Sequence, residues 1–76
     1  MEIKILGTGC PKCDKLENET RLAAEEMGLD CTIEKISQVK DIMAYGVMIT
    51  PALVVDGEVK AVGKVPARDE IKGLLT

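Results

Sequence analysis

The sequence predicts a small α/β fold with the order βαβαββα, in which helices cover both faces of a mixed four-stranded sheet. Three observations predict it. Short apolar runs of strand length alternate with segments of helical spacing. The first strand–helix–strand unit has the form of a right-handed crossover, which makes its strands parallel neighbours. An Asp-Gly pair separates the last two strands, which makes them an antiparallel hairpin.

The first half of the chain supplies the crossover. Residues 2–6 predict a strand, and residues 11–27 predict a helix that ends before Gly28, a residue suited to the position after a helix. Residues 31–36 predict a second strand, and its two adjacent charged residues indicate a sheet edge. The residues of the helix that recur at its inward spacing are Leu16, Thr20, Ala23, Ala24 and Met27.

The second half supplies a short helix, a hairpin and a final helix. Ser37 is expected to cap a helix of about two turns that ends at Gly46. Asp56-Gly57 predicts a two-residue hairpin turn, because a type I′ turn needs positive φ at both positions. The remaining segments are predicted to be two strands and a helix, over residues 52–55, 58–62 and 67–75.

Composition narrows the function classes. The 76 residues (1–76) are expected to form a single domain with a thin core. A net charge of −3 with dispersed Lys and Arg disfavours nucleic acid as a partner. No apolar stretch approaches the ~20 residues of a membrane span, and no signal peptide is evident, so a cytoplasmic protein without a membrane partner is expected. With no Phe or Trp, the methionines Met27, Met43 and Met48 are expected to fill the core.

Cys10-Pro11-Lys12-Cys13 carries the strongest chemical signal. In the cytosol a close cysteine pair is usually catalytic or metal-binding. Cys10 is expected at the amino end of the first helix, where free N–H groups and the helix dipole stabilise a thiolate and lower its pKa. Lys12 adds a positive charge, and Pro11 stiffens the loop at no cost in hydrogen bonds. The preceding Gly7-Thr8-Gly9 is expected to be a turn that lets a substrate chain approach Cys10.

This arrangement predicts dithiol exchange. Cys10 is expected to attack a substrate disulfide, and Cys13, one helical turn further on, to be shielded and to release the product. The reaction needs no cofactor beyond the Cys10–Cys13 disulfide itself. Cys31 is expected to be a small core residue.

Metal binding is the other use of two close thiols. A zinc site needs four ligands, and the chain has no His and a single CxxC. Copper(I) needs only two thiolates, so a soft-metal chaperone that uses the same pair is the alternative function. Such chaperones have the order βαββαβ, whereas here a helical segment follows the second strand.

Thr50-Pro51 stands at the entry to the strand at 52–55, where a proline is tolerated. On base rates alone its peptide bond would be trans. With CxxC after the first strand and Thr-Pro before the third, the chain resembles the thioredoxin/glutaredoxin superfamily. More narrowly, it resembles the small prokaryotic thioredoxin-like redox-active disulfide proteins, over essentially its whole length.

The resemblance implies the thioredoxin fold and the activity of a thiol–disulfide oxidoreductase in electron transport. It implies disulfide-containing proteins as substrates and a donor similar to thioredoxin reductase; we expect the chain to act as a monomer. It also implies a cis Thr50–Pro51 bond beside the two cysteines, with Thr50 backbone groups that pair with an extended substrate segment. Gly9, Pro11 and Lys12 complete the expected substrate-binding residues.

The chain departs from the families that it resembles in the motif itself. Gly9 stands where thioredoxins carry Trp, and Pro11-Lys12 replaces their Gly-Pro. Proline at the first middle position is similar to glutaredoxins, but their aromatic residue is missing. Glutaredoxins also carry a Gly-Gly and acidic signature after the last strand, and here only Gly63-Lys64 stands in its place. A glutathione site is therefore poorly supported.

Overall fold

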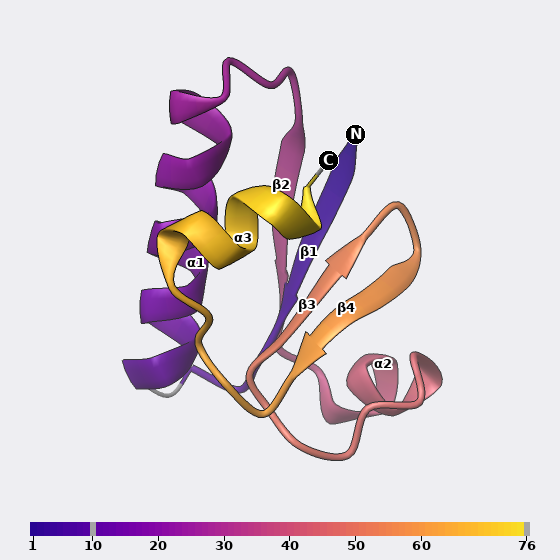
Figure 1. Cartoon of the computed structure of the whole chain (residues 1–76). Helices are drawn as coiled ribbons and strands as arrows, with labels where there is room; N and C mark the ends of the chain where they lie inside the picture. Colours follow the sequence, from indigo (N-terminus) through magenta and orange to yellow (C-terminus); the bar gives the residue numbers. More distant parts are fainter. Residues whose placement is uncertain (10, 76) are drawn as a thin grey trace.

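The computed structural model describes residues 1–9 and 11–75, and over these residues the elements follow the predicted order. Figure 1 shows them as β1 (Glu2–Leu6), α1 (Pro11–Glu26), β2 (Thr32–Ile36), α2 (Val39–Ala44), β3 (Ala52–Val55), β4 (Glu58–Val62) and α3 (Arg68–Leu74). The α/β fold class is therefore confirmed.

The four strands form a single mixed sheet in the order β2-β1-β3-β4. β1 and β2 are parallel, as the crossover requires, and β3 runs antiparallel to both β1 and β4. β2 is an edge strand, as its charged residues indicated. The hairpin turn has φ of 50° at Asp56 and 81° at Gly57, the positive values on which the prediction of that turn rested.

Each side of the sheet has its own apolar cluster, and β3 contributes to both. Leu53 and Val55 pack into the larger cluster, whereas Ala52 and Val54 pack into the smaller one. Successive side chains of a strand point to opposite faces. Since a cluster covers each face, every residue of β3 is buried. The larger cluster also contains residues of α1 and α3, and the smaller one contains Ile42 of α2.

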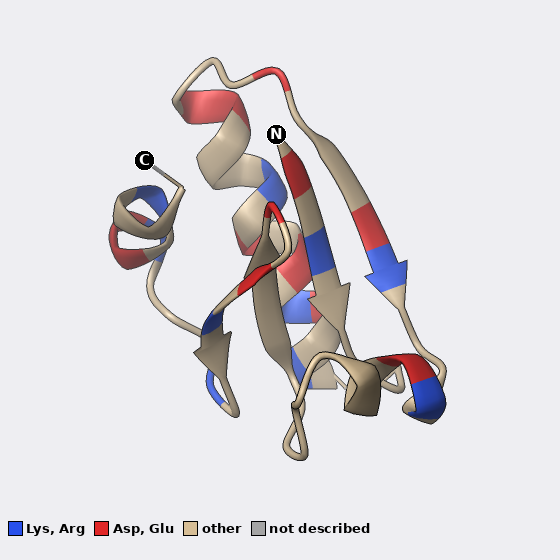
Figure 2. Cartoon of the chain, turned by 90° about the vertical axis from the view of Figure 1, so that its right-hand side faces the viewer, with Lys and Arg blue, Asp and Glu red and all other residues tan. Residues whose placement is uncertain are grey.

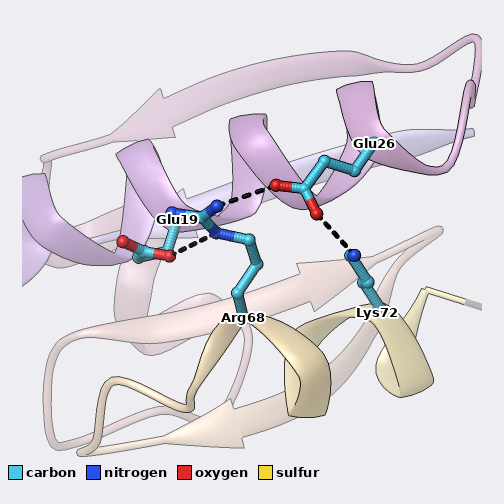
Figure 3. A network of polar contacts seen from close by, with 4 residues as sticks. All are labelled: Glu19, Glu26, Arg68 and Lys72. Carbon is cyan, nitrogen blue, oxygen red and sulfur yellow. Dashed lines mark hydrogen bonds and ion pairs between the residues drawn. The ribbon is translucent and has the colours of Figure 1, made fainter.

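A network of four charged side chains fastens α3 to α1 (Figure 3). Arg68 donates to Glu19 at 2.9 Å and to Glu26 at 2.7 Å, and Lys72 donates to the other oxygen of Glu26 at 2.5 Å. The hydrogen bond from Arg68 lowers the pKa of Glu19, and the bonds from Lys72 and Arg68 lower the pKa of Glu26. The network thus adds ionic links between the two helices that contribute to the larger apolar cluster.

The structure corrects two expectations about the segment around α2. Its N-cap is Gln38 and not Ser37, and no side-chain hydrogen bond caps the helix. Met43 and Met48 are 59% and 89% exposed, so they are not core filler. The physical reason for Met43 is the shortness of α2, which buries a single residue, Ile42. In the segment after α2, Val47 packs into the smaller cluster and Met48 does not. Met27 does pack against the larger cluster, as expected.

Within the described residues, no helix combines the length and the apolar character that crossing a membrane requires.

Candidate functional site

Cys13 lies in the first turn of α1 and its side chain is fully buried. Cys10, the expected nucleophile, lies outside the described residues. A cysteine without solvent access is poorly placed to meet a large substrate first, so the burial of Cys13 suits a thiol that acts second.

Gly7 makes room for Cys13. A Cβ added at Gly7 would overlap the Cβ and Sγ of Cys13, so only glycine allows the end of β1 to approach this sulfur. The N–H of Gly7 donates to the carbonyl of Ile36 at 2.9 Å, which ties the same point to the end of β2. Sequence reasoning assigned Gly7 to a turn that serves the substrate and missed its contact with Cys13. The signal was a small residue directly after the first strand.

Thr50 and Pro51 enter the sheet next to this point. Their peptide bond is cis, the isomer that the resemblance implies. Ala52, the next residue, pairs with Leu6 in the antiparallel register of β1 and β3. When this register is continued by one residue, Pro51 comes to the position opposite Gly7. Pro51 is buried, and its carbonyl accepts a hydrogen bond from the N–H of Gly63 at 2.7 Å.

The other predicted substrate-binding residues lie at the surface around the amino end of α1. Gly9, Pro11 and Lys12 are exposed. Gly9 has φ of 92°, a conformation that L-residues with a side chain rarely adopt. Thr50 is half-buried, so it remains accessible from solvent while the proline after it is not.

An ion pair flanks Cys13 on the side of β2. Lys35 donates to the carboxylate of Asp14, the residue after Cys13, at 2.7 Å. This bond raises the pKa of Lys35, and the nearby carboxylate of Glu17 raises it further. Sequence reasoning identified Lys35 only as a mark of an edge strand. The structure adds it as a cation near the buried thiol.

A pocket of about 240 Å³ opens beside the two loops of the site. Thr8, from the loop after β1, and Thr50, from the loop before β3, both line it. Its other walls come from α2 and from the segment that follows α2. The pocket thus brings together residues that are 42 positions apart in the sequence, each adjacent to a predicted site motif.

The third cysteine, Cys31, lies away from this pocket. It is half-buried, is in no disulfide, and packs against the larger apolar cluster. Among residues 1–9 and 11–75, no group of three or more His, Cys, Asp or Glu side chains is placed to hold a metal ion.

Comparisons with known proteins agree with this geometry. A family model described as "Thioredoxin domain" matches residues 1–76. A curated thioredoxin from Methanothermobacter thermautotrophicus is 43% identical over 76 residues, which is all of this chain and 99% of that protein. A thioredoxin from Methanocaldococcus jannaschii is 40% identical over 70 residues, 92% of this chain and 80% of that protein. These comparisons lend no support to the copper(I) alternative.

Proposed function

The chain belongs to the thioredoxin family, and from this premise we propose that it reduces protein disulfides with Cys10 as nucleophile and Cys13 as resolving thiol. The observation that carries the proposal is the position of Cys13. It is buried in the first turn of α1, against Gly7, at the strand end toward which the Thr50–Pro51 segment runs. The family membership supplies the class of reaction.

The proposed reaction has two exchange steps. The Cys10 thiolate attacks one sulfur of the substrate disulfide, and the other substrate sulfur leaves as a thiolate that takes up a proton. The Cys13 thiolate then attacks the Cys10 sulfur, breaks the mixed disulfide and releases the second substrate thiol. The substrate gains two electrons and two protons, and the protein is left with a Cys10–Cys13 disulfide. No bound cofactor is required.

The surrounding residues have supporting roles in this proposal. The Thr50 backbone pairs with an extended substrate segment in the manner of an added strand. The exposed Gly9 and Pro11 allow that segment to approach closely, and Lys12 adds positive charge near the reacting thiolate. An external reductase similar to thioredoxin reductase reopens the Cys10–Cys13 bond, and the reducing cytoplasm is the compartment in which such a monomer would act.

Reduction of insulin by dithiothreitol, followed by turbidity, tests the activity. The wild-type protein should accelerate precipitation, and Cys10→Ser and Cys13→Ser should remove the acceleration. Cys31→Ser is the matched control, because it deletes a thiol outside the site, and it should retain the wild-type rate. If the wild-type protein were no faster than Cys10→Ser, the proposed activity would be wrong.

Trapping tests the assigned roles. Cys13→Ser should accumulate a mixed disulfide with insulin through Cys10, because the resolving thiol is gone. Cys10→Ser should accumulate none, since the remaining thiol of the pair is buried. The opposite pattern on a non-reducing gel would exchange the two roles.

A further inference from the structure

The pocket beside the site has an apolar lining that the proposed reaction does not use. Val39, Ile42 and Met43 of α2 form one wall, and Met48 forms another. None of its lining residues is charged, and the segment between α2 and β3 carries no charged residue (Figure 2). Thr8 and Thr50 supply hydroxyl groups on the side toward the two site loops.

The exposure of this lining indicates a binding surface. Val39, Met43 and Met48 are 58%, 59% and 89% exposed, although each is large and apolar. Single exposed apolar residues are ordinary, but several around one concavity are typical of an interaction site. Methionine side chains are flexible and polarisable, so two of them can adapt to occupants of different shape.

The size of the pocket limits what it holds. Pockets for drug-sized molecules enclose about 300–1,000 Å³, and this one encloses about 240 Å³ and is open to solvent. It fits one large side chain better than a cofactor. The position of the pocket indicates that this side chain comes from the substrate protein. Thr8 lies two residues before Cys10, and Thr50 lies directly before Pro51.

We propose that this pocket receives one large apolar side chain of the substrate protein, close in sequence to the cysteine that Cys10 attacks. This inference rests on the proposed function, because a substrate segment must first lie along Thr50. It defines the substrate class more narrowly, as disulfides flanked by leucine, methionine, phenylalanine or a similar residue.

The geometry also predicts a positional rule. Successive side chains of an extended segment point to opposite sides. The pocket lies on the α2 side of the site, so only one flank of the substrate cysteine should show the preference. Within that flank the effect should be strong at one position and weak at its immediate neighbours. Because the walls include two methionines, leucine, methionine and phenylalanine should be accepted almost equally.

Synthetic peptides with one central cysteine, joined by a disulfide to 2-nitro-5-thiobenzoate, provide the test. The Cys10 thiolate attacks the peptide sulfur, and the aromatic thiolate leaves with the electron pair of the broken bond and is read by its absorbance. A leucine is moved through each position on either side of the cysteine in an otherwise serine and glycine peptide. At one position on one side we expect kcat/KM to rise about tenfold, the lower end of the range for apolar pockets.

Variants of the lining test the assignment to this pocket. The double substitution Met43→Gln and Met48→Gln keeps side-chain length and should reduce the tenfold preference to about twofold, since it replaces the apolar walls by amides. Both residues are exposed, so the fold should tolerate the change. Val62→Thr is the control: Val62 is exposed and apolar, but it lies on β4 and does not line the pocket. It should keep the preference.

The small disulfide 2-hydroxyethyl disulfide separates this inference from the proposed function. It has no side chain for the pocket, so wild type and the double variant should reduce it at equal rates. Reduction of this compound without any preference among the peptides would overturn the pocket and leave the oxidoreductase intact. A preference unchanged in the double variant would also overturn it. Failure to reduce any of the disulfides would overturn the proposed function and the inference together.

Discussion

The two faces of the sheet are built very differently. On one face α1 and α3 cover a cluster in which ten of the described residues are buried. The four-charge network of Arg68, Lys72, Glu19 and Glu26 joins the two helices (Figure 3). On the other face the six residues of α2 cover a cluster that has five buried members among the described residues. Around that smaller cluster, Val39, Met43 and Met48 remain exposed.

This difference between the two faces indicates that one face mainly stabilises the fold and the other mainly contacts substrates. A 76-residue domain has a thin core, and most of its packing lies under α1 and α3. The α2 face contributes less to that core, and it borders the Thr8 and Thr50 loops through the shared pocket. We therefore expect substitutions on the first face to act mainly on folding and those on the second face to act mainly on substrates.

Core truncations test this comparison with the largest expected effect. Ile71 is fully buried in the larger cluster, and Ile71→Ala should cost about 3–5 kcal/mol of unfolding free energy. Ile42 borders the open pocket, so Ile42→Ala should cost less, about 2 kcal/mol. A domain of this size has about 4–11 kcal/mol in total, so the first variant should approach unfolding. Urea denaturation measures both values.

Equal costs for the two truncations would contradict the comparison. The smaller cluster would then be as important for folding as the larger one. The peptide preference predicted above gives a second readout, because Ile42→Ala should alter it and any folded fraction of Ile71→Ala should keep it.

Gly7 lies directly after β1 and against Cys13 of α1, and its substitution should affect the dithiol more than the fold. In Gly7→Ala the new methyl overlaps the buried sulfur of Cys13, so the sulfur or the end of β1 must move. Overpacking of this kind costs about 1–3 kcal/mol. Insulin reduction should fall at least tenfold, because displacement of a reacting group by about 1 Å has larger effects than that.

Gly73→Ala is the matched control for Gly7→Ala. A Cβ added at Gly73 meets nothing within 4 Å, and the residue lies inside α3. Alanine there should raise stability by about 0.5–1 kcal/mol, because glycine is a poor helix former. Its insulin reduction should equal that of the wild type. Activity in Gly7→Ala that fell only in proportion to its folded fraction would remove the special role of Gly7.

The order of elements, the parallel crossover and the hairpin follow from local rules, and the sequence therefore predicted them. Apolar spacing, Gly28 after α1 and the Asp56-Gly57 turn each depend on residues close together in the chain. The same local reasoning predicted that Cys13 would be shielded, since it lies one helical turn after Cys10, and its side chain is fully buried.

Features that depend on several distant segments were missed. The contact of Gly7 with Cys13 depends on how α1 lies against the end of β1, and the ion pair of Lys35 with Asp14 joins two elements. The exposure of Met48 contradicted its composition-based assignment to the core, because in the segment between α2 and β3 it is the neighbouring Val47 that packs into the smaller cluster. Residue type gives no information on which of the two is covered.

Thr20 offers a smaller test on the α1 face. Its side chain is fully buried, and within the described part of the chain its Oγ1 finds no hydrogen-bond partner. Valine has nearly the same shape, so Thr20→Val should raise the unfolding free energy by about 1 kcal/mol by removing an unsatisfied hydroxyl. Thr20→Ser keeps the hydroxyl and deletes the methyl, so it should lower stability. A loss of stability in Thr20→Val would show that the hydroxyl has a partner.

The exposed ionic network should have the smallest effect, visible mainly in acid. Glu19 and Glu26 have pKa values below the ordinary 4.5 because they accept bonds from Arg68 and Lys72. A depressed pKa in the folded state stabilises the protein fully above the unfolded value. That contribution is lost as the pH falls through the folded value, so stability should decline below about pH 4.5.

Arg68→Met keeps an apolar stem but removes both bonds of the guanidinium, so its stability should fall less steeply with acid than that of the wild type. Lys64→Met is the control and should keep the wild-type slope. It deletes a surface ion pair with Glu70 at 3.2 Å, and that pair does not join α1 to α3. Added salt should narrow the difference between Arg68→Met and the wild type, because exposed charges are screened. If the curves of stability against pH for Arg68→Met and the wild type were parallel from pH 7 to pH 3, the network would hold α3 in place without contributing to acid sensitivity. The two faces would then not differ in their ionic contribution to stability.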